Sequence, residues 1–343
     1  MKMRILTLAL IIAAFTTFTA FADGHMPGKG VTVTPARATW DTGWFQEALI
    51  RKGMEELGYK VKRAKDLANP IFYQSVTLGD VDYWANGWFP MHNAQLPKNF
   101  DEHAEKVGYV MKAGGLQGYL VSKKYADQYN IKSLDDFKRP EVKKAFDSNG
   151  DGKADLIACP PGWGCEKTIT YHMDVYDLED HIKPIKASYS ASMAEGLAKH
   201  QNGEPVFFYT WSPNWTIFKL KPGEDVVWIN VPETMPNEAQ KPYADMMEVS
   251  GIKGAVSDPI KLGFVVTDIR AVANKEFLKD NPAAAAFLEA FKLDLEDVNA
   301  QNTRMNEGEK STKDIKNHVD EWIANNKDKW NSWLDAARKA AKM

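Results

Sequence analysis

The amino-acid sequence predicts an α/β protein with more than one domain, and three observations support this prediction. Strand-like apolar segments alternate with segments of helical spacing between residues 31 and 84, the pattern of an α/β domain with a largely parallel sheet. A second region of this kind begins near 118–122. The chain has 343 residues, and this length is sufficient for two domains.

The first region is predicted to be strand, helix, strand, helix and strand. Short β-branched or aromatic runs place the strands at 31–34, 59–61 and 81–84. A helix capped by Asp41 or Thr42 is expected to end at Gly58, and a second helix around 72–78 is expected to end at Gly79. Apolar residues on one face support the first helix: Phe45, Leu49, Met54 and Leu57.

The rest of the chain continues this alternation. Further strands are expected at 118–122, 226–229 and 262–266, with the polar segment 231–261 as the most loop-like part. A helical tract follows near the carboxyl end. Its tryptophans fall at helical spacing and are predicted to be packing residues: Trp322, Trp330 and Trp333.

The amino terminus has the pattern of a secretory signal peptide, which we assign to residues 1–22. Lys2 and Arg4 supply the positive region, and an apolar segment leads to the small-x-small pattern at 20–22. A transmembrane anchor is the alternative, but the apolar run is short and lacks flanking stop-transfer charges. We therefore expect export to the periplasm, no membrane insertion of the mature chain, and no lipid anchor, because no cysteine follows the cleavage site.

The charge balance argues against nucleic-acid binding. The chain carries a net charge of −3, and loss of Lys2 and Arg4 with the signal peptide makes it −5. Lysine and arginine are scattered along the chain and form no basic stripe. The compositional excess is aromatic, with eleven tryptophans.

The only two cysteines, Cys159 and Cys165, bracket the segment CPPGWGC. In an oxidising compartment this pair favours a disulfide, which contributes about 2 kcal/mol in the chain-entropy model. A zinc site is disfavoured because it needs four ligands at recognisable spacing, and the chain has no second cysteine pair. A redox site is excluded because it needs the spacing Cys-x-x-Cys. Two prolines restrict the backbone of this segment, two glycines permit positive φ angles beside the ring, and the disulfide makes the loop rigid. We therefore expect it to present Trp163 and bare backbone N–H groups to a ligand.

The remaining tryptophans differ in their surroundings. Trp228 lies in an apolar run that is predicted to be a buried strand, whereas Trp40, Trp44 and Trp84 have no clear assignment. Three others stand where a strand or loop breaks, which is the usual place of binding residues in an α/β fold: Trp88, Trp163 and Trp211.

The segment 147–155 matches the start of a calcium loop. Asp147, Asn149 and Asp151 occupy positions 1, 3 and 5, Gly152 occupies position 6, and Asp155 lies further along. The twelfth position is alanine, however, and Cys-Pro-Pro follows where a helix is required. A tight turn with internal hydrogen bonds is the favoured interpretation, with calcium as the alternative.

Three separated motifs resemble the periplasmic glycine betaine-binding proteins of ProU-type ABC importers, the ProX-like family: GWFPMH (87–92), CPPGWGCE (159–166) and YTWSPNW (209–215). Shorter similarities occur at 118–129, 147–156 and 272–284, so the resemblance covers almost the whole mature chain. Two segments differ from the family pattern: 231–261 is longer, and 83–87 carries the additional ring of Trp84.

This resemblance implies a two-lobed periplasmic substrate-binding protein of type II, a Venus-flytrap fold with the ligand cleft between the lobes. It places lobe 1 at 23–116 and 264–343, and lobe 2 at 117–263. Hinge segments are expected near 113–118 and 262–267. Ligand binding would then shift the population from an open to a closed state, which the permease recognises.

The resemblance also implies the roles of six residues. Trp88, Trp163 and Trp211 form an aromatic box around a quaternary ammonium group, which has no N–H to donate and is recognised by ring faces. His92 and the backbone amides of Gly164 and Cys165 bind a carboxylate, and the hydrogen bond from His92 would strengthen on protonation.

The function implied is a periplasmic receptor that delivers glycine betaine to the permease and ATPase of an ABC importer for osmoprotection. Alternatives of the same fold would bind proline betaine, dimethylsulfoniopropionate or choline. A secreted carbohydrate-binding protein is a further alternative, because tryptophan faces also stack on sugars. No nucleophile–base pair or catalytic metal cluster emerges, so we expect a monomer that is not an enzyme and needs no cofactor.

Overall fold

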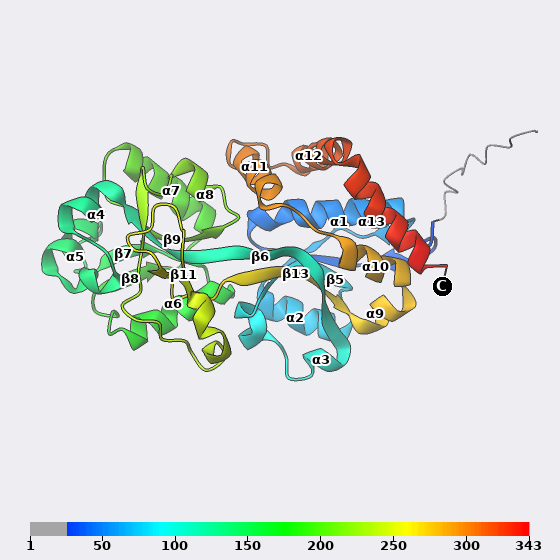
Figure 1. Ribbon diagram of the computed structural model, residues 1–343, viewed down its shortest axis with the longest axis horizontal. Coiled ribbons are helices and arrows are strands. Elements are labelled where there is room, and N and C mark those ends of the chain that lie inside the picture. The colour runs from blue at the N-terminus through cyan, green and yellow to red at the C-terminus, as the bar shows by residue number, and fades with distance from the viewer. Residues whose placement is uncertain (1–25, 343) are drawn as a thin grey trace, which may run out of the picture.

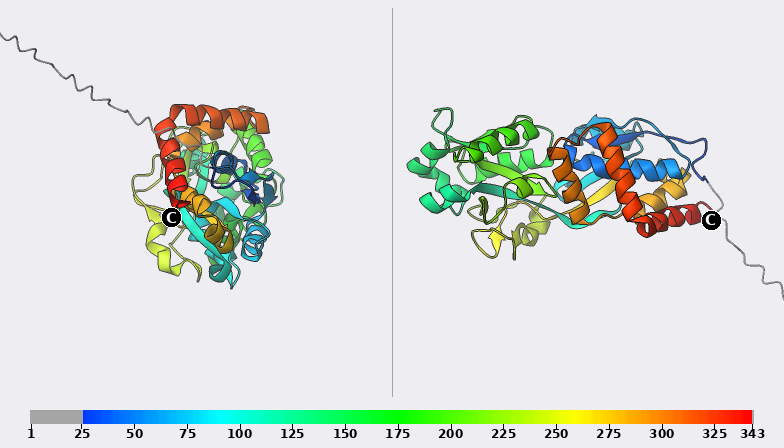
Figure 2. Two further views of the ribbon diagram at one scale, coloured as in Figure 1. Left: turned by 90° about the vertical axis from the view of Figure 1, so that its right-hand side faces the viewer. Right: turned by 90° about the horizontal axis from the view of Figure 1, so that it is seen from above.

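The computed structural model describes residues 26–342, so the signal peptide assigned to 1–22 lies outside the described residues. Two α/β halves lie side by side along the longest axis of the molecule (Figures 1 and 2). The helices are α1 Trp44–Glu56, α2 Asn69–Leu78, α3 Phe100–His103, α4 Lys123–Tyr129, α5 Pro140–Phe146, α6 Gly164–Val175, α7 Tyr189–Gln201, α8 Thr216–Lys219, α9 Lys275–Asp280, α10 Pro282–Ala290, α11 Leu295–Asn306, α12 Thr312–Asn325 and α13 Lys327–Ala340.

The strands form one nine-stranded sheet and two small ribbons within the described chain. The large sheet contains β2 Pro35–Ala38, β4 Lys65–Leu67, β5 Tyr83–Phe89, β6 Ala104–Ser122, β7 Ala154–Ile157, β8 Ile182–Ile185, β9 Phe207–Ser212, β10 Val226–Ile229 and β13 Thr267–Asn274. The ribbons are β1 Thr32–Val33 with β3 Lys60–Val61, and β11 Glu248–Val249 with β12 Ile260–Lys261.

The parallel arrangement predicted from the segments between residues 31 and 84 is confirmed for the strands there, whereas the centre of the sheet is antiparallel. Strands run in the order β4-β2-β5-β13-β6-β9-β7-β8, and β10 pairs with β6. The outer pairs β4–β2, β2–β5, β9–β7 and β7–β8 are parallel. All pairs that involve β6 or β13 are antiparallel, because these two strands carry the chain between the halves in opposite directions.

The helices predicted in the first region are present, but the predicted cap is wrong. Residues 41–43 form a short 3₁₀ turn, so α1 begins at Trp44 with Gly43 as its N-cap and with no side-chain cap. The predicted stops are confirmed: Gly79 directly follows α2 with a φ angle of 79°, and Gly58 follows the C-cap residue of α1 with a φ angle of 92°. Glycine takes this left-handed conformation without the steric cost of a side chain.

The strand predicted at 262–266 is also wrong. Leu262, Phe264 and Val265 are buried, yet the strand begins only at Thr267. Phe264 packs against aromatic rings of the half that contains β9, and an apolar run does not distinguish such packing from a sheet. The predicted strand at 226–229 is confirmed as β10, and its Trp228 is buried.

The carboxyl-terminal tryptophans are packing residues, as predicted. Trp322 on α12 stacks on Trp333 of α13 at a centroid distance of 5.8 Å, and Trp330 contacts Phe287 of α10 at 5.9 Å. These helices cover one face of the half that contains β5 (Figure 1).

The connection between the halves consists of β6 and β13. Within β6, pairing with β13 extends to Gly115 and pairing with β9 begins at Leu116. The division of lobes proposed from the sequence at residues 116 and 117 falls at this change of partner, and it stays a prediction. An ideal Cβ on Gly115 would lie 2.0 Å from Thr267 Oγ1 and 2.7 Å from Trp88 Cζ3, so only glycine fits at this crossing.

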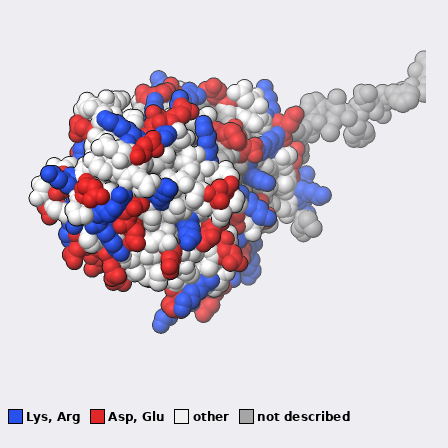
Figure 3. All heavy atoms as spheres, turned by 60° about the vertical axis from the view of Figure 1, so that its left-hand side comes forward, with Lys and Arg blue, Asp and Glu red and all other residues white. Residues whose placement is uncertain are grey.

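The described surface shows interspersed charges. Figure 3 shows lysine and arginine mixed with aspartate and glutamate over the face that it presents, with no extended patch of one sign. Residues 26–342 contain no helix with the length and apolar character needed to cross a membrane.

Candidate functional site

A cavity with about 280 Å³ of space, part of it open to solvent, lies where the two halves meet. All six residues to which the sequence assigned a ligand line it, and four further residues complete its wall. The full lining is Trp40, Trp88, Met91, His92, Gln117, Trp163, Gly164, Cys165, Tyr209 and Trp211. Residues from both halves are thus brought to one place, although their individual roles stay predictions.

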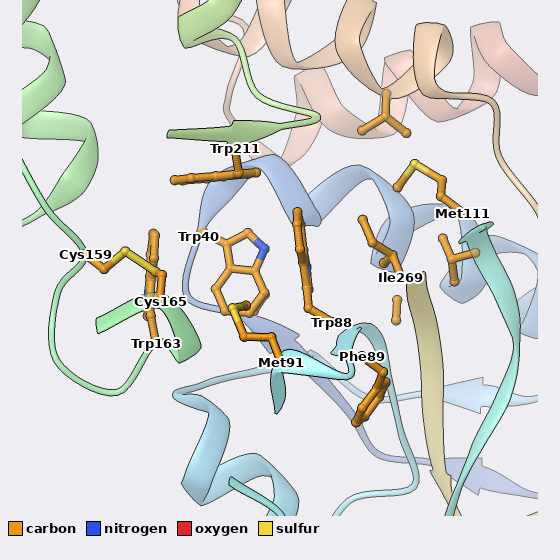
Figure 4. Close-up of a cluster of buried hydrophobic side chains, with 14 of the residues drawn as sticks. Trp40, Trp88, Phe89, Met91, Met111, Cys159, Trp163, Cys165, Trp211 and Ile269 are labelled. Atoms are coloured by element: carbon orange, nitrogen blue, oxygen red, sulfur yellow. A yellow bond between two sulfur atoms is a disulfide. The ribbon is translucent and has the colours of Figure 1, made fainter. Parts of the chain in front are cut away.

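Four indole rings line the cavity together with the phenol ring of Tyr209. Trp163 and Trp88 stand at opposite sides of Trp40, and Trp211 lies across the top of the group (Figure 4). The ring centroid of Trp163 lies 5.3 Å from that of Trp40 and 5.5 Å from that of Trp211, with both contacts edge-to-face. The rings therefore present faces and edges in several directions around one space.

The disulfide predicted between Cys159 and Cys165 is present and closes the loop that carries Trp163. The indole Nε1 of Trp163 donates to Thr39 Oγ1 at 2.9 Å, across the boundary between the halves. The loop thus fixes the backbone on one side, while a hydrogen bond from the other half fixes the ring.

Helix α6 begins at the cavity wall. Gly164 and Cys165 are its first two residues, Trp163 is its N-cap, and no side chain caps the helix. The first backbone N–H groups of a helix have no partner within the helix, and its dipole favours a negative charge at this end. This end of α6 therefore has the chemistry of a carboxylate site.

His92 lies against the start of α6. Its Nδ1 accepts from the backbone N–H of Trp88 at 3.1 Å and lies 2.7 Å from the Tyr73 hydroxyl. Its Nε2 lies 3.0 Å from Nδ2 of Asn69, so both ring nitrogens face donors. Burial lowers the pKa of His92 to about 3. The ring is therefore neutral near neutral pH, and the strengthening of its hydrogen bond on protonation that the sequence suggested does not arise there.

Four lining residues were not predicted as ligand-binding residues from the sequence: Trp40, Met91, Gln117 and Tyr209. Met91 lies within the GWFPMH motif, and Tyr209 opens YTWSPNW, so both were next to assigned residues. Tyr209 donates to Gln117 Oε1 at 2.6 Å, which joins β9 to β6 beneath the cavity. Trp40 lies two residues beyond β2, a strand that was not predicted from the sequence, so no local signal singled it out.

Trp84, the extra ring in the first motif, lies behind the cavity. It is buried and contacts Phe72, Tyr73, Trp40 and His92. It therefore supports the wall of the cavity from the core and does not line it. The segment 231–261 contains a 3₁₀ helix (Lys241–Met247) and the β11–β12 ribbon, and none of its residues line the cavity.

The segment 147–155 forms a turn held by its own side chains. Asp147 accepts hydrogen bonds from the backbone N–H groups of Gly150 and Gly152 at 2.7 and 2.8 Å. Asp155 accepts from the backbone of Ser148 at 3.0 Å, and Asp151 pairs with Lys183. Carboxylate oxygens of this loop are thus used in internal contacts.

We expect calorimetry to show no stoichiometric calcium binding after treatment of the protein with a chelator. The reason is that Asp147 and Asp155 already accept backbone hydrogen bonds, and Ala158 stands where a glutamate ligand is required. Binding of one equivalent of calcium would contradict the assignment of this segment as a turn.

A second buried histidine predicts a pH dependence of stability. His172 contacts the Tyr119 hydroxyl and the Gly263 carbonyl, and burial lowers its pKa to about 3. Below about pH 6.5 the unfolded chain binds a proton that the native protein excludes, so stability falls as the pH drops. His92 acts in the same direction, whereas the raised pKa of buried Glu47 opposes it.

Chemical denaturation at several pH values tests this. Between pH 6.5 and 4 the unfolding free energy of the wild type should fall more steeply than that of His172→Gln, by up to about 1.4 kcal/mol per pH unit. Equal slopes would show that His172 is not held neutral.

Comparisons with known proteins agree with this architecture. Residues 31–325 match the family described as the substrate binding domain of ABC-type glycine betaine transport systems. The chain is 39% identical over 336 residues to the glycine betaine-binding periplasmic protein OusX of Dickeya dadantii, with 98% of each chain covered. It is 37% identical over 344 residues to the glycine betaine/proline betaine-binding periplasmic protein of Escherichia coli, with both chains fully covered.

Solved structures show the same fold at lower identity. Lactococcal OpuAC in its closed-liganded conformation with glycine betaine matches with a TM-score of 0.66 at 19% identity, covering 89% of this chain and 99% of that one. An ABC-transporter choline binding protein in complex with choline matches with a TM-score of 0.67 at 17% identity, covering 90% and 98%. The chain therefore belongs to the family of substrate-binding domains of ABC-type glycine betaine transport systems and has the two-lobed fold of type II periplasmic binding proteins.

Proposed function

We propose that this protein is a periplasmic receptor that binds glycine betaine between its two lobes and delivers it to an ABC importer. The observation that carries the proposal is the junction of two chemistries in one cavity. Four tryptophans line one part, and the uncapped start of α6 lies directly beside them. The names of the relatives from Dickeya dadantii and Escherichia coli support the same ligand.

The tryptophan faces suit the trimethylammonium end of the ligand. A cation over an aromatic face gains about 0.5–2 kcal/mol, and most when water is excluded. Trp88, Trp163 and Trp211 are all nearly buried. Several such contacts, with the burial of methyl groups, supply a large part of the roughly 8 kcal/mol that micromolar affinity requires.

The start of α6 suits the carboxylate end. The backbone N–H groups of Gly164 and Cys165 carry the positive end of the helix dipole. His92 Nε2 lies close by, since an ideal Cβ on Gly164 would be 3.3 Å from it. The neutral His92 ring and two backbone N–H groups would thus surround the carboxylate without a buried protein cation.

Contacts between the two lobes indicate that the structure represents a closed state. Trp163 donates to Thr39, Lys219 pairs with Glu307 at 2.9 Å, and the Ser190 hydroxyl lies 3.4 Å from Asp41 Oδ2. In an open state these contacts would separate, with lobe 1 at 23–116 and 264–343 moving against lobe 2 at 117–263. The motion would be taken up at 113–118 and 262–267, and a ligand that touches both lobes favours the closed state.

The proposal includes a location and partners. A cleavable signal peptide at 1–22 would export the chain, and the mature monomer would deliver its ligand to the permease and ATPase. We assign no enzymatic activity to it and no cofactor.

Titration of the wild type with glycine betaine, proline betaine, dimethylsulfoniopropionate and choline, read by tryptophan fluorescence, tests the proposal. Because the indoles line the cavity, binding should change the emission. We expect saturable binding of glycine betaine, and weaker binding of choline, which keeps the cation and lacks the carboxylate. Absence of glycine betaine binding would contradict the proposal. Tightest binding of another member of the panel would reassign the ligand.

A further inference from the structure

Trp40 is a fourth tryptophan of the cavity, and it comes from a different strand than Trp88. It follows β2 in extended conformation, with φ −93° and ψ 131°, and is only 6% exposed. Its ring lies between those of Trp88 and Trp163 (Figure 4). From behind, Trp84 supports it at a centroid distance of 5.6 Å. Trp40 therefore closes a side of the space that the other three rings leave open.

Asn86 holds both of the tryptophans contributed by lobe 1. Its Oδ1 accepts from Trp40 Nε1 at 2.8 Å and from Trp88 Nε1 at 2.8 Å. An indole N–H is only a donor, so the amide must present its oxygen to both rings. Asn86 is 1% exposed, and water does not compete for this oxygen. One buried atom thus sets the orientation of two rings.

The strand pattern brings these three residues together. Asn86 and Trp88 lie two residues apart on β5, and alternate side chains of a strand share one face. β2 runs parallel to β5, with Ala36 opposite Trp84, so the chain that leaves β2 passes the end of β5. The next turn packs tightly: an ideal Cβ on Gly43 would lie 3.1 Å from Trp40 Nε1 and 3.2 Å from Asn86 Cγ.

We propose that Trp40 is the fourth face of the cation cage, that Asn86 is its positioning residue, and that the two together make the site select a fully methylated ammonium group. This inference rests on the proposed function of the cavity. A trimethylammonium group has no N–H, whereas a dimethylammonium group has one that needs an acceptor. Ring faces offer no strong acceptor, and the oxygen of Asn86 is already used by two indoles. An N–H that enters the cage would therefore lose its hydrogen bond to water without replacement.

Calorimetry with glycine betaine and N,N-dimethylglycine tests this on three variants. Trp40→Leu should weaken glycine betaine binding about five- to thirtyfold, the loss of one buried cation–π face. Dimethylglycine should lose less, because water admitted by the smaller side chain can accept its N–H. Asn86→Leu introduces a side chain of similar size and keeps all four rings. It should nevertheless reduce the ratio of the affinity for glycine betaine to the affinity for dimethylglycine. The control is Trp44→Phe, since Trp44 donates to the Ala38 carbonyl and does not line the cavity.

Trp40→Phe provides a second route to the same hydrogen bond, because it removes the N–H and keeps a ring. It should narrow the ratio even if Asn86→Leu does not fold, and its effect should not add to that of Asn86→Leu where both fold. The inference is overturned, and the proposed function is kept, if the wild type binds glycine betaine but the Trp40 and Asn86 variants have the same ratio of glycine betaine to dimethylglycine affinity as the wild type. A wild type that binds neither amine overturns the proposed function with it.

Discussion

Trp163→Ala is expected to reduce glycine betaine affinity about thirty- to a hundredfold, a loss of roughly 2–3 kcal/mol of the kind seen at buried aromatic hot spots. The ring contacts Trp40 and Trp211 and donates to Thr39, so it belongs both to the cation cage and to the contact between lobes. Its removal should therefore weaken ligand binding directly and also weaken closure.

The fold should survive this substitution, because the disulfide holds the backbone of the loop that carries Trp163. Thermal unfolding without ligand checks this point, and isothermal calorimetry measures the affinity. Thr39→Val is the companion variant: it keeps the ring and removes the acceptor, so it should cause a smaller loss. Affinity within threefold of the wild type for Trp163→Ala would show that this ring does not contact the ligand.

Local signals in the sequence were sufficient for features that neighbouring residues determine. Helices α1 and α2 stop before Gly58 and Gly79 because the chain adopts a left-handed backbone conformation there. Glycine adopts this conformation readily, so its position in the sequence predicts the end of the helix. The segment around Trp163 was recognisable because its cysteines, prolines and glycines are adjacent in the chain.

Features that depend on distant segments were not predictable in this way. The antiparallel centre arises because β13, near residue 270, lies between β5 and β6, and both of these strands come from a much earlier part of the chain. The strand predicted at 262–266 is absent for a similar reason, since Phe264 packs against Tyr119, His172 and Tyr209 from distant segments, and the strand begins only at Thr267.

The cavity shows the same limit. The six residues assigned to it came from motifs, and each motif could be read alone. Trp40 and Asn86 have no such motif: their hydrogen bond joins residues 46 positions apart and exists only because β2 lies beside β5. A pattern within one segment contains no information about that neighbour, so the sequence left Trp40 without an assignment.

Gly164→Ala is expected to separate the two ends of the ligand. An ideal Cβ at this position would lie 2.9 Å from His92 Cδ2 and 3.0 Å from Met91 Cε. Met91 can move, but the imidazole is held by Tyr73 and Trp88, so the methyl group must displace either His92 or the start of α6. The carboxylate then loses at least one charge-assisted hydrogen bond, and glycine betaine affinity should fall about ten- to a hundredfold.

Choline distinguishes this explanation from general damage to the site. It carries the same trimethylammonium group and lacks the carboxylate. Its affinity should therefore change by less than about threefold, because the contacts of the cation with the rings are unchanged in this variant. Thr170→Ala, on the same helix but outside the cavity, is the control and should leave both ligands unaffected. An equal loss for both ligands would mean that the start of α6 shapes the cage as a whole. A loss confined to glycine betaine would assign the carboxylate to the backbone of this helix, and it would explain why the residue after Trp163 has no side chain.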